Sequence, residues 1–273
     1  MLGADLLDRI AAEIRQAQDR GRQLPPLTSR HAEFSLEDGY AVAARVHVAR
    51  VAGGAQPRGR KIGFTNANIW PEYGVHHPIW GWVYEHTLVE ADGGGTARLS
   101  LHGLAEPKIE PEVAFGLRSA PPAGADVAQL LDCIEWVAPA FEIVQSHFPG
   151  WKFQAADTVA DGGLHARLVL GARRPLEALA ADPAATLAGL ELVLECDGRQ
   201  VEVGRGSHVL GSPLAALAHL VALLATQEDV GLRPGEVITT GTVTAAYPVQ
   251  AGQRWQARPA GGVLPPLALE LTA

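Results

Sequence analysis

The sequence has few cysteines, few lysines and no cluster of basic residues. Its two cysteines, Cys133 and Cys196, lie far apart without metal-site spacing, which favours free thiols in a reducing compartment. The net charge is −8 and no run of Lys or Arg occurs, which argues against nucleic acid or an anionic membrane as a partner. With three lysines among 22 basic residues, a remaining lysine could stand where a compact, tunable ammonium is needed.

Long hydrophobic runs are also missing. No stretch is expected to reach the length of a membrane span, and the first thirty residues lack the apolar segment of a signal peptide. We therefore expect a cytoplasmic protein without membrane contact. The 273 residues, 47% hydrophobic and 19% charged, are typical of a globular protein that buries a large core.

The sequence of the N-terminal part predicts two helices. Apolar residues recur at helical spacing over residues 6–14 and predict a helix that ends before Gly21. Ser35-Leu36-Glu37-Asp38 is close to a capping box and predicts a second helix through about Val51. We expect residues 1–57 to form a small helical region and residues 58–273 to form the main domain.

The sequence of the main domain predicts many short strands and few helices. Residues 70–82, dense in aromatic and turn-forming residues, predict a long loop of the kind that more often serves function than structure, and residues 145–163 predict a second loop. Strands are expected at about 59–65, 107–116, 140–144, 164–170, 190–196, 199–204, 236–240, 254–257 and 267–271, and helices at 126–137 and 214–225.

One predicted strand carries two carboxylates at alternate positions. Glu110 and Glu112 share one face, roughly 7 Å apart along the backbone, while Ile109 and Val113 fall on the apolar face. Pro111 lacks a ladder donor, which predicts an edge strand or a bulge. A solvated acidic edge would explain the pair by itself, whereas a hard-cation site needs a third oxygen ligand.

A third carboxylate is available at Glu142, in an apolar strand where burial without a partner is costly. Three strand carboxylates without thiolates or paired histidines suit Mg²⁺, Mn²⁺ or Ca²⁺ rather than zinc. His76 and His77 could also bind metal, but adjacent strand residues point apart and a turn is the simpler interpretation. Composition alone leaves the metal site and the solvated edge about equal.

Nucleotide and serine-hydrolase motifs are not supported. The glycines of residues 204–211 follow a predicted strand and precede a helix, but their spacing differs from the dinucleotide fingerprint. Residues 239–242 lack a phosphate-binding lysine, and no Gly-x-Ser-x-Gly elbow occurs.

Several motifs together point to one family. Gly59-Arg-Lys-Ile-Gly-Phe-Thr65, Pro107-Lys-Ile-Glu-Pro-Glu-Val-Ala-Phe115 and Pro139-Ala-Phe-Glu-Ile-Val-Gln-Ser146 occur in order along the chain. With them, the sequence resembles the 2-keto-4-pentenoate hydratase and 4-oxalocrotonate decarboxylase family of the fumarylacetoacetate hydrolase superfamily, over nearly its whole length. Further matches lie at residues 151–153, 158–162, 209–213 and 240–242.

The resemblance implies an α+β fold: a fumarylacetoacetase-like mixed β-roll or barrel body with a small N-terminal helical region. It also implies bound Mg²⁺ or Mn²⁺ and a homo-oligomer. By motif position, the metal ligands are Glu110, Glu112 and Glu142, the catalytic residue is Lys61, and the substrate contacts are Thr242, Asp161 and Ile79.

The implied chemistry suits these residue types. A hard cation can chelate the carboxylate and 2-oxo group of a 2-oxo acid and stabilise the enolate that forms when a proton moves. Lys61 could hold the substrate carboxylate, or shuttle a proton if its pKa is lowered. A surface lysine is the alternative interpretation.

Departures from the family pattern bear on the reaction. Hydratases carry an acid in a Pro-Asp-Phe-Gly-like turn, whereas this chain has Ile79 there, as decarboxylases do, and it also resembles them at residues 244–246. His147 and Gly162 replace the family's Arg and Asn. The hydrolase branch's lysine, about twenty residues after the third ligand, is missing, which disfavours C–C hydrolysis. Candidates to replace the acid are Glu72, His76, His77 and Glu85.

The sequence therefore predicts a divalent-metal-dependent lyase acting on a 2-oxo acid of aromatic catabolism. The first hypothesis is a hydratase that adds water to a 2-oxo-4-enoate such as 2-keto-4-pentenoate. The alternative is a decarboxylase of a 4-oxalocrotonate-like 2-oxo diacid. A third hypothesis, from another class, is a non-catalytic metal-stabilised binding protein.

Overall fold

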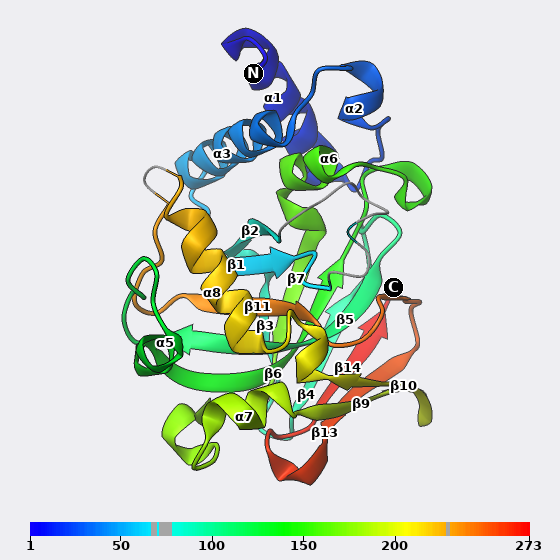
Figure 1. Cartoon of the computed structure of the whole chain (residues 1–273). Coiled ribbons are helices and arrows are strands. Elements are labelled where there is room, and N and C mark those ends of the chain that lie inside the picture. The colour runs from blue at the N-terminus through cyan, green and yellow to red at the C-terminus, as the bar shows by residue number, and fades with distance from the viewer. Residues whose placement is uncertain (67–69, 71–77, 228–229) are drawn as a thin grey trace.

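The computed structural model describes residues 1–66, 70, 78–227 and 230–273. The helices are α1 (Ala4–Arg20), α2 (Leu27–Arg30), α3 (Leu36–Ala52), α5 (Val127–Cys133), α6 (Ala155–Ala160), α7 (Pro183–Ala188) and α8 (Pro213–Leu224). Helices α1, α2, α3 and α6 lie above a large sheet, and a smaller sheet lies below it (Figure 1).

The large sheet has the strand order β2-β1-β11-β5-β6-β7-β3, and the short strands β12 and β8 pair with β5 and β6. The smaller sheet has the order β10-β9-β13-β14-β4. The bounds are β1 (Pro57–Gly63), β2 (Ile79–Tyr84), β3 (Leu88–Glu90), β4 (Thr96–Ser100), β5 (Lys108–Leu117), β6 (Ile134–Val144), β7 (His165–Leu170), β8 (Arg174–Pro175), β9 (Glu191–Cys196), β10 (Arg199–Arg205), β11 (Val237–Thr242), β12 (Tyr247–Pro248), β13 (Arg254–Pro259) and β14 (Leu267–Thr272).

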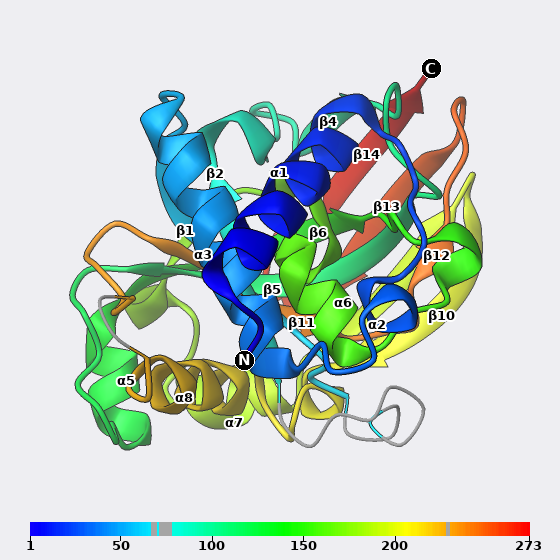
Figure 2. The same ribbon diagram turned by 90° about the horizontal axis from the view of Figure 1, so that it is seen from above.

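The two predicted N-terminal helices are present as α1 and α3, and α2 was not predicted. The capping box is confirmed: the Asp38 amide donates to Ser35 Oγ over 3.2 Å, and the Ser35 amide donates to the Asp38 carboxylate over 3.0 Å. The side chain of each residue accepts a hydrogen bond from the backbone amide of the other, which fixes where α3 begins. Seen from above, α1 and α3 lie over the large sheet (Figure 2).

The N-terminal helices share a core cluster with a later segment. Leu7, Ile14 and Val42 pack with Phe148 and Ala156. Residues 145–163, predicted as a loop, therefore contribute α6 to this cluster, and that part of the prediction is wrong. The domain boundary at residue 57 stays a prediction, because the helical region buries its apolar face partly against this later segment.

The strand β5 lies in the middle of the large sheet, between β11 and β6, so the predicted edge position is wrong. The predicted bulge in the Pro111 strand is not found there either: the extra residue lies in the partner strand, where the register of β11 shifts between Thr239 and Thr242 opposite β5. Val243 donates its amide to the Pro111 carbonyl over 3.0 Å. Pro111 has no amide hydrogen to donate, and that side of the residue faces the irregular part of β11.

Two further boundaries differ from the sequence predictions. Helix α5 ends at Cys133 and residues 134–137 begin β6, because β-branched and aromatic residues there pair with β5 although their spacing also fits a helix. Residues 79–82 belong to β2 rather than to a loop, and pair antiparallel with β1. The rest of that predicted loop, residues 71–77, lies outside the described residues.

Helix α8 is a core helix. The Leu214 amide donates to Ser212 Oγ, which caps the start of the helix. The apolar residues of α8 join the main core with both sheets. By length and composition alone, Gly206–Leu224 is apolar enough to cross a membrane, so the expectation that no stretch reaches that length is wrong. Packing against the sheets accounts for this apolar character.

Candidate metal centre and substrate pocket

Three carboxylates converge on one face of the large sheet. Glu110 pairs directly with Glu142 across β5 and β6, and Glu112 follows on the same face of β5. One oxygen of each carboxylate lies within 4.8 Å of the others. Glu112 and Glu142 are fully buried, and Glu110 is partly open to a pocket. The interpretation as a solvated acidic edge is therefore wrong.

Some of the carboxylate oxygens have hydrogen-bond donors and others do not. Glu112 Oε2 accepts from the Gly241 amide over 2.8 Å, but its buried Oε1 accepts no hydrogen bond. Glu142 Oε1 contacts His165 Nδ1 at 2.8 Å, and the Lys61 ammonium lies 3.1 Å from its Oε2. A buried carboxylate oxygen without a donor is costly unless a cation faces it. The oxygen-only donor set fits a hard divalent cation.

Electrostatics at the triad indicate an excess of negative charge. Burial raises the pKa of Glu110 to about 7 against the attraction of Lys61. Burial and the two neighbouring carboxylates raise the pKa of Glu112 well above its ordinary value. Burial also raises the pKa of Glu142, but Lys61 and His165 outweigh it and hold the net pKa below the ordinary value. A divalent cation would relieve this repulsion.

Lys61, on β1, is buried beside the triad. Its ammonium donates to the Gly163 carbonyl over 2.9 Å in addition to contacting Glu142. Burial lowers its pKa, but Glu142, Glu110 and Glu112 together raise the pKa above the ordinary value. Without a cation at the triad, the three carboxylates therefore favour the charged form of the lysine, and its catalytic role stays a prediction.

Two residues that the sequence did not single out orient the triad. His165, on β7, contacts Glu142 through Nδ1 and Thr87 Oγ1 through Nε2, at 2.8 and 2.9 Å. The Thr87 hydroxyl donates to the Tyr84 carbonyl, which fixes the position of its oxygen. The imidazole is thus held between the Thr87 hydroxyl and the Glu142 carboxylate. No local pattern around residue 165 predicts it, because the contact depends on the β6–β7 register.

The bulge of β11 is the second orienting device. Gly241 has φ +92°, and a Cβ there would lie 1.9 Å from Thr65 Oγ1. Only glycine tolerates both this backbone conformation and this close approach. The bulge directs the Gly241 amide at Glu112.

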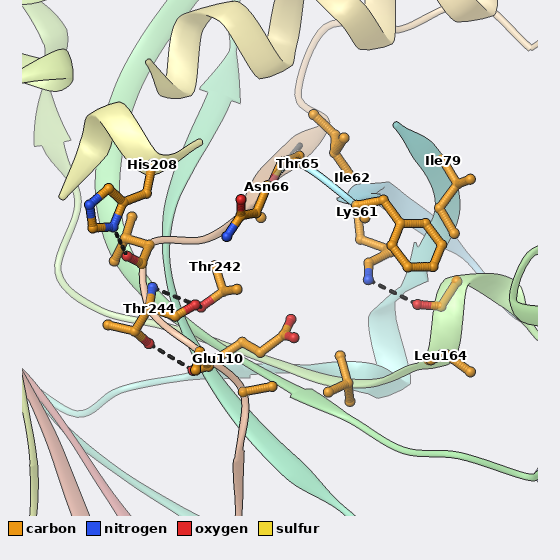
Figure 3. A pocket seen from close by; sticks show the side chains of 18 of the residues that line it. Lys61, Ile62, Thr65, Asn66, Ile79, Glu110, Leu164, His208, Thr242 and Thr244 are labelled. Atoms are coloured by element: carbon orange, nitrogen blue, oxygen red, sulfur yellow. Dashed lines mark hydrogen bonds between the residues drawn. The ribbon is translucent and has the colours of Figure 1, made fainter. Parts of the chain in front are cut away.

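A pocket of about 860 Å³ opens in front of Glu110 and Lys61 (Figure 3). Ile79, only 2% exposed, and Thr242 both line it, as the resemblance implied for substrate contacts. The Thr242 hydroxyl donates to the Thr244 carbonyl and accepts from the Thr244 amide, which shapes the turn beside the pocket. Both substrate-binding roles stay predictions.

The structure does not place Asp161 with the triad. Both of its carboxylate oxygens contact His147 Nδ1, at 2.9 and 2.8 Å, and one accepts from Gln18 Nε2. Asp161 lines a second cavity of about 750 Å³ instead. Among the described residues it thus joins α6 to the end of β6 and to α1, and its role as a substrate contact stays a prediction.

The suggested replacements for the missing acid gain no support. Glu85 is exposed and pairs with Arg58 at 3.0 Å, and it is not among the residues that line the pocket. Glu72, His76 and His77 lie outside the described residues.

Comparison with known proteins shows the family to which the chain belongs. The model of the fumarylacetoacetate (FAA) hydrolase C-terminal family matches residues 78–262. The chain belongs to the fumarylacetoacetate hydrolase family. This confirms the resemblance drawn from the motifs, and the α+β architecture of fumarylacetoacetase type is confirmed with it.

Relatives within this family include enzymes of two reaction types. The chain is 33% identical to 2-hydroxyhexa-2,4-dienoate hydratase of Comamonas testosteroni over 88% of each chain. It is 30% identical to a 4-oxalocrotonate decarboxylase of Pseudomonas sp. over 90% of this chain and 91% of the other. Its fold superposes on 4-oxalocrotonate decarboxylase from Pseudomonas putida G7, complexed with magnesium and adipate, with TM-score 0.91, 27% identity and 99% coverage of each chain.

Proposed function

We propose that this protein is a divalent-metal-dependent lyase that acts on a 2-oxo acid, as a hydratase of a 2-oxo-4-enoate such as 2-keto-4-pentenoate. The observation that carries the proposal is the buried triad, in which Glu112 Oε1 accepts no hydrogen bond, beside a ligand-sized pocket that Glu110 and Lys61 line. The names of the relatives, hydratases and decarboxylases, support the same reaction class.

Glu110, Glu112 and Glu142 would hold the cation, and we propose Mg²⁺ or Mn²⁺ because all three ligands are hard oxygen donors. When bound, the cation supplies Lewis-acid stabilisation of negative charge on a 2-oxo acid. The Lys61 side chain, fixed by the Gly163 carbonyl, lies beside the triad. There it can pair with the substrate carboxylate and orient the 2-oxo group.

The buried surroundings strengthen these contacts. Ile79 and Leu164 line the pocket near Lys61 and exclude water from that wall (Figure 3). In a site of low polarity, the ammonium attracts a carboxylate more strongly than it would in water.

Decarboxylation of a 4-oxalocrotonate-like diacid is the second candidate, and a specific observation favours it. Ile79 offers no carboxylate to activate water at the position where the hydratases carry an acid, and it is almost wholly buried. Loss of CO₂ requires no attacking water. The solved decarboxylase of similar fold is complexed with magnesium and adipate, a six-carbon diacid.

The non-catalytic hypothesis gains nothing from the structure, and the named relatives are enzymes. The cytoplasmic location, the homo-oligomer and the absence of nucleic-acid and membrane partners stay predictions.

Turnover assays test the proposal. Ultraviolet-monitored reactions would use 2-hydroxypenta-2,4-dienoate and 4-oxalocrotonate, each with Mg²⁺, Mn²⁺ or EDTA, with products identified by mass. Metal-dependent gain of water supports the hydratase, and loss of CO₂ supports the decarboxylase. If neither substrate is turned over while metal is bound, the proposed substrate class is contradicted.

A further inference from the structure

A turn of four residues lies between the pocket and the second cavity. Gly163 and Leu164 line the pocket together with Lys61, whereas Asp161 and Gly162 line the cavity of about 750 Å³. The turn follows α6 and leads into β7. A segment with space on both sides has fewer packing partners than a segment of the close-packed core, so its position depends on its hydrogen bonds.

The backbone of this turn is unusual. Gly162, Gly163 and Leu164 have φ of +69°, +72° and +63°, which makes three left-handed residues in succession. Leucine rarely adopts this conformation, which costs of order 1–3 kcal/mol, so the contacts around the turn impose it. Strand β2 also approaches closely, because a Cβ at Gly81 would lie 2.2 Å from the Gly162 carbonyl oxygen.

The turn holds Lys61. Lys61 Nζ donates to the Gly163 carbonyl over 2.9 Å (Figure 3). Gly163 also lies against the stem of the lysine, since a Cβ there would be 2.9 Å from Lys61 Cδ. Lys61 is paired with Gly81 across β1 and β2, so the turn contacts the strand pair that carries the lysine. A shift of the turn would therefore move Lys61 Nζ away from its place 3.1 Å from Glu142.

Asp161 anchors the start of the turn. Its side chain is buried, and its two oxygens lie 2.9 and 2.8 Å from His147 Nδ1. Gln18 Nε2 donates to one of these oxygens over 3.0 Å, and Gln18 Oε1 accepts from Arg50 over 2.7 Å. The Leu24 amide donates to the His147 carbonyl over 2.7 Å, which fixes the histidine in turn. The carboxylate thus ties the turn to the segment after β6 and to α1.

We propose that Asp161 is a positioning residue, which fixes this turn so that the Gly163 carbonyl holds Lys61 at the pocket. Asp161 acts on the reaction through the lysine, in place of the substrate contact that its motif position implied. The inference rests on the proposed function in one respect, that the reaction uses Lys61. The placement of the lysine is a separate property, which can be measured without turnover.

The small number of lysines provides the measurement. The chain has Lys61, Lys108 and Lys152, so lysine labelled with ¹³C at Cε gives three signals in a nuclear magnetic resonance spectrum of the full chain. Lys61→Arg identifies the signal of Lys61. Asp161→Asn keeps the shape of the side chain but replaces one accepting oxygen with an amide donor. At one fixed pH it should move the Lys61 signal and leave the other two in place.

Activity and metal binding provide a second readout. Asp161→Asn should lower kcat about ten- to a hundredfold, because a displacement of about 1 Å at a reacting group can cost a hundredfold. The Kd of Mg²⁺, measured by calorimetry, should stay within about twofold, because Asp161 contacts none of the triad carboxylates. A general loss of structure would weaken both.

Asp157→Asn is the matched control. Asp157 is a buried aspartate of α6, four residues before Asp161, and its carboxylate accepts from the Thr28 amide and hydroxyl over 3.0 and 2.7 Å. Its substitution also removes a buried hydrogen bond to the N-terminal region, so Tm should fall. The Lys61 signal should nevertheless stay in place, and kcat should stay within about twofold.

Gln18→Leu is a milder variant for the case that Asp161→Asn does not fold. It removes one donor to Asp161 and should move the Lys61 signal in the same direction by a smaller amount. An unmoved Lys61 signal in Asp161→Asn, or an equal displacement in Asp157→Asn, overturns the inference. If the wild type turns over neither proposed substrate, the proposed function fails, whereas the lysine spectrum still decides whether Asp161 holds Lys61 in place.

Discussion

The triad beside the pocket is built from paired strands, whereas part of the remaining lining comes from turns. The triad lies on β5 and β6, two neighbouring strands whose register sets the spacing of its carboxylates. The remaining lining includes Phe64, Trp151, Leu164 and Leu210. These four are among the six non-glycine residues with positive φ in the described part of the chain.

Strands and turns serve two different tasks in this pocket, holding the metal ligands and contacting the substrate. Ligands that must converge within a few ångströms need a scaffold whose geometry is fixed by a hydrogen-bonded ladder. Residues that contact the variable part of a substrate can lie on turns, where strain and side-chain size adjust the pocket. We therefore expect changes at the strand end to abolish chemistry, and changes at the turn end to alter which substrate binds.

The largest effect should follow from Glu112→Gln. Removing one charge from the triad should lower metal affinity and reduce kcat/KM by at least about a thousandfold, because a bound metal contributes several kcal/mol of charge stabilisation. Circular dichroism should show the fold intact. Glu191→Gln, an exposed change on β9 in the other sheet, should leave activity within about twofold. Retained activity in Glu112→Gln would show that the triad is structural.

Gly241→Ala should destabilise the fold. The new Cβ would meet Thr65, and the bulge that presents the Gly241 amide to Glu112 would shift. We expect a loss of roughly 2–5 kcal/mol in the free energy of unfolding, from clash plus conformational strain.

Gly252→Ala is the control for that change, because Gly252 has a similar φ of +90° and no heavy atom near its added Cβ. It should cost only about 1–2 kcal/mol, the strain alone. Urea denaturation compares the two variants, and equal losses would mean that contact with Thr65 does not matter.

His165→Gln should weaken metal binding about ten- to a hundredfold, because the ring orients Glu142 and removing such support commonly has this effect. Isothermal titration with Mn²⁺ measures it. Thr87→Val, which removes only the oxygen behind the ring, should weaken binding less. If Thr87→Val equals or exceeds His165→Gln, the imidazole is not the group that orients the ligand.

The smallest effect should be the pH dependence of stabilisation by metal. The raised pKa values of Glu110 and Glu112 mean that metal-free folded protein loses stability as pH rises from about 4.5, the ordinary value, through about 7 for Glu110. Added Mg²⁺ should offset this loss. The rise in Tm on adding Mg²⁺ should therefore be a few degrees larger at pH 8 than at pH 6, and a larger rise at pH 6 would contradict the assignment.

The sequence alone determined the local features. The alternation of Glu110 and Glu112, the capping box at Ser35 and Asp38, and the spacing of most strands depend on residues close together in the chain. Side-chain period and capping chemistry act over a few residues, so they can be predicted without the fold. The same motifs identified the family.

Only the tertiary structure decided the rest. The central position of β5, the pairing of Glu110 with Glu142 and the contact of His165 with Glu142 are set by strand order and register. The position of Asp161 beside His147 depends on how α6 packs. Each of these contacts joins segments far apart in the sequence or elements whose pairing no local pattern encodes, because strand order and helix packing follow from burial of the whole core.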